Sequence, residues 1–109
     1  MLLQGWHKGR PSDEPAGYGL RLTPGDRDRN FDSSWTSVDV ELEGGTTVAV
    51  TLNPSFWRSC PELRSPEIGA WLLASGAAPW PLGDPPSVVV RLIEGNRFSA
   101  RMHVVRSVL

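Results

Sequence analysis

The chain of 109 residues contains one cysteine, one lysine and two histidines, and its apolar runs are only a few residues long. A single cysteine excludes an internal disulfide and a multi-cysteine zinc site. The short apolar runs leave no candidate for a transmembrane span or for the core of a secretory signal peptide. A cytoplasmic protein without membrane contact is therefore the expectation, and the length is that of one domain.

Side chains that could perform chemistry are equally sparse. Cys60 would need a base to act as a nucleophile, and the only histidines, His7 and His103, are far from it in the sequence. Cysteine is most often a small buried apolar side chain, which is our interpretation of Cys60. These three residues show no metal-ligand spacing, and the glycines of "EGG" and "EGN" indicate hairpin turns rather than a phosphate-binding loop. The sequence predicts neither an enzyme nor a bound cofactor.

The most regular segment is residues 37–52, "SVDVELEGGTTVAVTL", in which apolar and polar residues alternate strictly. Alternation with a period of two indicates half-buried strands. Both apolar sets share a face if Leu42 opposes Val48, which predicts a hairpin with a three-residue loop over residues 44–46.

A second hairpin is predicted over residues 87–104, "SVVVRLIEGNRFSARMHV", with its turn at residues 94–96. A three-residue loop places Val88, Val90, Leu92 and the residues paired with them on one face. Arg97 and Arg101 then lie on the opposite, polar face.

Two helices are predicted from their end signals. Thr23 is an N-cap followed by proline, which indicates a short helix over about residues 24–30. Ser65 caps the main helix, about residues 65–75, and Gly76 suits the left-handed conformation that commonly ends a helix.

The predicted fold is mainly β with α (α+β), a small antiparallel barrel-like or pseudobarrel sheet of about five to seven strands. "AGYGLRL" predicts a further short strand, and the proline-rich "AAPWPLGDPP" predicts an extended connector. Residues 1–15 contain two glycines and two prolines and are predicted to form an irregular N-terminal arm. Residues 16–109 would then form a single barrel-like domain.

Five tryptophans and a strong preference for arginine over lysine are the features that favour binding. Trp6 and Trp57 each lie in a segment without a strand or helix signal, and each has basic neighbours. Exposed aromatic and basic side chains are typical of contacts to single-stranded nucleic acid. Anchoring of a loop on the core explains either tryptophan equally well.

The order strand, short helix, strands, main helix and closing "GNRF" hairpin resembles the B-three-type DNA-binding pseudobarrel over residues 17–104. "IGAWLLASGAAPWPLGDPPSVVV" resembles the family's segment from helix to hairpin, with Leu82, Gly83 and Asp84 in the turn. The resemblance implies DNA binding through two arms, one around the first strand and one before the main helix. "SFWRSCPELRS" is in addition similar to a small group of bacterial proteins, which implies no function.

The leading expectation is a non-catalytic nucleic-acid-binding domain with DNA as the ligand, contacting it through the N-terminal arm and the loop before the main helix. The candidate contact residues are Lys8, Arg10, Arg21, Trp57, Arg58, Arg64, Arg97 and Arg101. The alternative is a protein-interaction module or homodimeric accessory protein that uses the Trp57 loop and the proline-rich connector. The net charge of −1 suits this alternative better than nucleic-acid binding.

Overall fold

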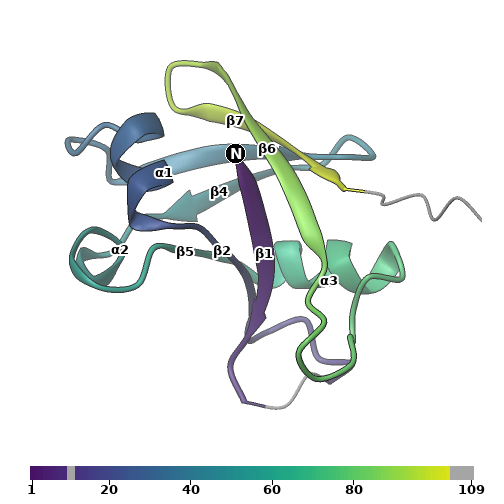
Figure 1. Ribbon diagram of the computed structural model, residues 1–109. Coiled ribbons are helices and arrows are strands. Elements are labelled where there is room, and N and C mark those ends of the chain that lie inside the picture. The colour runs from purple at the N-terminus through teal and green to yellow at the C-terminus, as the bar shows by residue number, and fades with distance from the viewer. Residues whose placement is uncertain (10–11, 104–109) are drawn as a thin grey trace, which may run out of the picture.

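Seven strands and three short helices occupy the part of the chain that the computed structural model describes, residues 1–9 and 12–103 (Figure 1). The strands are β1 (Leu2–His7), β2 (Tyr18–Arg21), β3 (Ser37–Leu42), β4 (Thr47–Thr51), β5 (Glu62–Arg64), β6 (Ser87–Glu94) and β7 (Arg97–Met102). The helices are α1 (Pro24–Asn30), α2 (Pro54–Arg58) and α3 (Pro66–Ala74). The prediction of a mainly β fold with one main and one short helix is confirmed.

All the strands belong to one sheet with the order β4-β3-β7-β6-β1-β2-β5. The sheet curls into a nearly closed barrel, and its two edge strands, β4 and β5, contact each other. Neighbouring strands are antiparallel except for β3 and β7, which run parallel. The sheet is therefore mixed rather than antiparallel. A parallel pair needs a long crossover connection. Here residues 43–96 connect the end of β3 to the start of β7, and no short-range sequence pattern indicates that these two strands pair.

The prediction of an irregular arm is wrong for residues 2–7, which form β1 between β6 and β2. Gly5 does not interrupt the strand but permits a close approach of the proline-rich connector. Its N–H donates to the carbonyl oxygen of Pro86 over 2.8 Å. A Cβ on Gly5 would lie 2.9 Å from the Pro86 ring and 3.1 Å from the indole of Trp80. The proline-rich connector therefore packs directly on this strand.

The first hairpin has the predicted strands but not the predicted register. Val40, rather than Leu42, opposes Val48, and Glu41 and Thr47 form the last pair before the turn. The loop is consequently residues 42–46 instead of 44–46. A shift of two residues keeps every side chain on the same face, so burial alone could not distinguish the two loops.

The second hairpin has the predicted faces and, for most of its length, the predicted pairs. Leu92 opposes Phe98, but an irregularity between Leu92 and Glu94 makes Glu94 the partner of Arg97. The tip is thus Gly95 and Asn96, and the extra residue is absorbed in a bulge.

The predicted helix ends are confirmed. The Thr23 hydroxyl accepts the backbone N–H of Asp26 at the start of α1, and Ser65 caps α3. Helix α2 was missed, although Asn53 caps it in the same way and Pro54 begins it. A single turn of helix contains too few residues to show the apolar periodicity of longer helices.

The core fills the barrel with aliphatic and aromatic side chains from every strand and from helices α2 and α3. Its largest fully buried members are Tyr18, Phe56, Phe98, Leu3, Leu20, Leu63, Ile68 and Leu72. Burying a side chain of this kind contributes about 1.5–3 kcal/mol. Within the described residues no helix is long and apolar enough to cross a membrane.

Candidate functional site

The outward surface of β1, β2 and β5 brings together Trp6, Arg21, Glu62 and Arg64, a group that we call the Trp6 face. Leu20 of β2 and Leu63 of β5 are fully buried. Because successive side chains of a strand point to opposite sides of the sheet, the residues before and after these leucines point outward.

Gly19 lies between Trp6 and Arg64 in the strand register, and its lack of a side chain lets the Arg64 side chain cross it to Trp6. A Cβ on Gly19 would lie 2.8 Å from the carbonyl oxygen of Leu63. The guanidinium carbon of Arg64 is 4.3 Å from the centroid of the Trp6 ring, and that of Arg21 is 5.6 Å away. Both distances are within the range of cation–π attraction.

Glu62 holds the two arginines in place. Its Oε1 accepts from Nε of Arg21 over 3.2 Å and from Nη2 over 2.6 Å. Its Oε2 accepts from Nε of Arg64 over 2.8 Å and from Nη2 over 2.6 Å. The Glu62 side chain is 3% exposed, whereas those of Arg21 and Arg64 are 54% and 52% exposed. A buried anion thus orients two half-exposed cations, and the cluster keeps a net positive charge.

Lys8 extends this basic surface along the chain. It directly follows β1, its side chain is exposed, and its backbone N–H donates to Gly17 over 2.9 Å. Arg10, another predicted contact residue, lies outside the described residues. The structure therefore brings together Arg21 and Arg64 among the predicted residues and places Lys8 two residues after Trp6.

Two shallow hollows lie on either side of Arg21. One, of about 380 Å³, is lined by Trp6, Arg21 and the connector residues Trp80, Gly83 and Pro85. The other, of about 410 Å³, lies between Gln4, Arg21 and the residues that lead into α1. Arg21 can therefore reach a ligand in either hollow.

Trp57 and Arg58 are not part of this surface. Trp57 is half-buried against the core, with its ring perpendicular to that of Phe56 at a centroid distance of 5.0 Å. Arg58 is exposed in the last turn of α2. In the described part of the chain, neither side chain contacts the Trp6 face.

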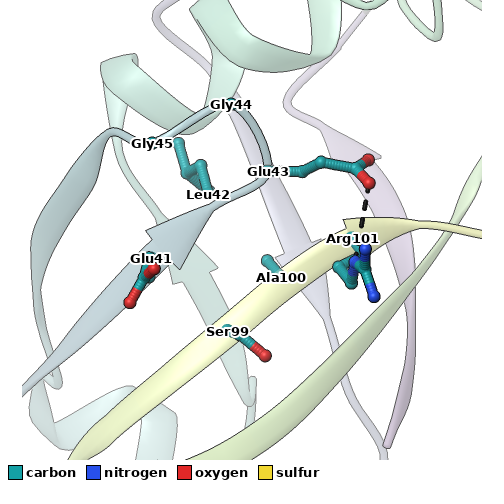
Figure 2. Close-up of a pocket in the computed structure, with 8 residues that line it drawn as sticks. All are labelled: Glu41, Leu42, Glu43, Gly44, Gly45, Ser99, Ala100 and Arg101. Atoms are coloured by element: carbon teal, nitrogen blue, oxygen red, sulfur yellow. Dashed lines mark ion pairs between the residues drawn. The ribbon is translucent and has the colours of Figure 1, made fainter.

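Arg97 and Arg101 lie on β7, separated from β2 by β6 and β1 in the sheet. Nη2 of Arg97 lies 3.2 Å from a carboxylate oxygen of Glu41, and Nε of Arg101 lies 3.5 Å from one of Glu43. Figure 2 shows the second pair, with Glu43 and Arg101 directed toward each other beside a hollow of about 330 Å³. The acidic residues of β3 and its turn therefore balance these arginines, which do not join the Trp6 face.

The interpretation of Cys60 as a buried side chain is wrong, because Cys60 is exposed. Over residues 1–9 and 12–103, no three metal-ligating side chains lie together.

His7 is instead the unusual polar side chain. Both of its ring nitrogens are buried without a hydrogen-bond partner in the described residues. Its ring packs against that of Tyr18 at a centroid distance of 4.3 Å. Burial raises the pKa of the Tyr18 hydroxyl, and the backbone N–H of Ser12, which donates to this oxygen over 3.1 Å, opposes the rise.

Trp6 and Glu62 were absent from the predicted contact residues. Gln4 and Trp6 alternate with buried Leu3 and Gly5, so the strand pattern was present in the sequence. The two glycines and two prolines of residues 1–15 obscured it.

Comparison of the chain with protein-family models, with curated proteins and with solved structures found no match.

Proposed function

We propose that this chain is a non-catalytic nucleic-acid-binding domain, with DNA as the ligand, and that it binds through the Trp6 face and Lys8. The observation that carries the proposal is the pair of half-exposed guanidinium groups held beside an indole by a buried carboxylate. Guanidinium groups bind phosphate oxygens through paired N–H donors. Aromatic side chains supply stacking surfaces that tolerate any base.

The donor count supports a phosphate ligand. A guanidinium carries five N–H donors, and Glu62 engages Nε and Nη2 of each arginine. Each group therefore retains three N–H donors, two on Nη1 and one on Nη2, and one from each nitrogen together form a fork of two parallel donors. Because both side chains are about half exposed, these forks are available to an anion from solvent.

The resemblance to the B-three-type pseudobarrel supports the same surface, and the nearly closed seven-strand sheet is compatible with it. The resemblance implies DNA contacts around the first strand and before the main helix. Trp6 and Lys8 belong to the first of these segments, and Arg64 directly precedes the Ser65 cap of α3. The contact between Arg64 and Trp6 joins the two segments.

The test is fluorescence anisotropy of labelled DNA oligonucleotides of mixed sequence, single-stranded and duplex, with the wild-type chain and Arg21→Gln. We expect micromolar or tighter binding, and we expect Arg21→Gln to weaken it several-fold because one phosphate contact is lost. Arg97→Gln is the matched control, since it removes the same charge from an arginine paired with Glu41. No binding at micromolar protein, or equal effects of the two variants, would overturn the proposal.

A protein-interaction surface is the second candidate, favoured by one observation on the connector. Leu82 is 101% exposed, far more than any other large apolar side chain in the described residues. A partner that covered Leu82 would remove this apolar area from water, which is favourable. Light scattering after size-exclusion chromatography tests the homodimer: a dimer that Leu82→Ser converts to monomer supports it. A monomeric wild-type chain at high concentration contradicts it.

A further inference from the structure

The geometry points to a slot for one unpaired base beside Trp6, which would make single-stranded nucleic acid the preferred ligand over duplex. This inference rests on the proposed function and specifies its substrate class. The slot is the hollow of about 380 Å³ between β1 and the proline-rich connector.

The lining of the slot combines aromatic rings with polar and glycine residues. Trp6 borders it with an indole on the outer side of β1, and His7 and Arg21 also line it. Trp80 approaches from the inner side of β1, where a Cβ on Gly5 would meet its ring at 3.1 Å, and it packs against Tyr18 at a centroid distance of 5.4 Å. The hydrogen bond between Gly5 and Pro86 fixes the connector to β1. A base stacked on Trp6 would therefore have the connector along its edge, and proteins that accept an extruded base hold it with aromatic and apolar side chains.

The positive charges of Arg21 and Arg64 lie where the phosphate backbone of a bound nucleic-acid strand would run. Arg64 reaches Trp6 from β5, across β2, whereas the connector approaches β1 from its opposite side. Trp6 therefore separates the arginines from most of the slot. Arg21 lines the slot as well, so a base against Trp6 and Trp80 would have its phosphate within reach of the Arg21 and Arg64 forks.

The slot is open to solvent on the side lined by Gly9 and Gly83. Among the described residues, a Cβ on either glycine would meet no atom within 4 Å. A base can enter from this side only if it is neither paired nor stacked in a duplex. Duplex DNA could contact the arginines but not the slot, and extruding a base from a duplex costs unpairing and unstacking energy.

The experiment compares binding of a labelled mixed-sequence single strand with that of the same sequence as a duplex. It uses the wild-type chain, Trp6→Leu and Trp57→Leu. We expect the wild-type chain to prefer the single strand at least tenfold. Trp6→Leu should weaken single-strand binding roughly five- to hundredfold, the usual effect of removing one stacking partner, and should affect duplex binding much less. Trp57→Leu is the matched control, because Trp57 is also half-buried but lies on α2.

A second readout places the base directly. A single strand containing one 2-aminopurine should lose fluorescence when it binds to the wild-type chain and to Trp57→Leu, but not to Trp6→Leu, because stacking on the indole quenches this base. Equal or tighter binding of duplex, or quenching that survives Trp6→Leu, would overturn the slot and leave the proposed function intact. Absence of binding to both single strand and duplex would overturn the proposed function itself.

Discussion

At the scale of single residues, Glu62 organises the Trp6 face. It accepts four hydrogen bonds from two arginines although its side chain is 3% exposed. We predict that Glu62→Gln lowers the free energy of unfolding by about 1–3 kcal/mol, since hydrogen bonds to a charged group are lost and the arginines repel each other. Urea-induced unfolding followed by tryptophan fluorescence measures the change.

Glu41→Gln is the control for this prediction, because Glu41 also pairs with an arginine but is 43% exposed. Exposed pairs contribute little to stability, so this variant should unfold close to wild type. Equal effects of the two substitutions would contradict the role assigned to the buried carboxylate.

Replacement of His7 should raise the free energy of unfolding, whereas Glu62→Gln should lower it. Its buried ring nitrogens have no partner in the described residues, and an unsatisfied buried polar atom costs free energy that an apolar ring of similar shape does not. His7→Phe should therefore raise the free energy of unfolding by about 1 kcal/mol. The midpoint of thermal unfolding should rise by a few degrees. His103→Phe, at an exposed position, should leave it unchanged, and a lower midpoint for His7→Phe would show that the imidazole is hydrogen-bonded in solution.

The two loop tryptophans show how far the sequence could predict the candidate site. Trp6 and Trp57 have similar local sequences, each beside basic residues, and Trp57 was preferred as a contact residue. The structure packs Trp57 on Phe56 and places Trp6 beside Arg21 and Arg64. These arginines lie far from Trp6 along the chain, so only the pairing of β1, β2 and β5 could reveal the difference.

At the scale of elements, two helical glycines allow a matched test of packing. A Cβ on Gly69 of α3 would overlap the carbonyl oxygen of Pro15, whereas a Cβ on Gly25 of α1 would meet only the end of the Arg29 side chain at 3.4 Å. We predict that Gly69→Ala destabilises by about 1–3 kcal/mol, the usual cost of overpacking. Gly25→Ala should be neutral or stabilise by up to about 1 kcal/mol, because alanine is the better helix former.

Chemical unfolding of both variants and the wild type distinguishes these effects. A stabilised Gly69→Ala variant would mean that residues 12–17 do not pack on α3 in solution. Equal destabilisation of both variants would mean that backbone conformation, rather than contact with Pro15, determines the result.

The elements that could be predicted from the sequence are those with strong local signals. Thr23 and Ser65, each followed by proline, located α1 and α3, and strict alternation located both hairpins. Register was harder to predict, since a shift by two residues buries the same side chains. Helix α2 and strand β5 were missed because each is too short to show a period.

At the scale of the whole molecule, closure of the sheet depends on pairs that no local pattern encodes. The parallel pair of β3 and β7 and the pairing of β1 with β6 both join segments far apart in the sequence (Figure 1). The same long-range pairs separate the charges of the chain. Arg97 and Arg101 lie against Glu41 and Glu43, while the Trp6 face lies on β1, β2 and β5, beyond β6 in the sheet. A net charge of −1 is therefore compatible with one locally basic surface.

This separation of charge predicts the salt dependence of binding. With Lys8, Arg21 and Arg64 as the phosphate contacts, the logarithm of the affinity for single-stranded DNA should fall with the logarithm of salt concentration with a slope of about −2, since each phosphate contact contributes about −0.7. Lys8→Gln should reduce this slope by about 0.7. Arg91→Gln removes the same charge from an exposed position on β6 and should leave the slope unchanged. Anisotropy titrations between about 50 and 200 mM salt measure all three slopes, and equal slopes for the two variants would show that the net charge of the molecule, rather than one surface, governs binding.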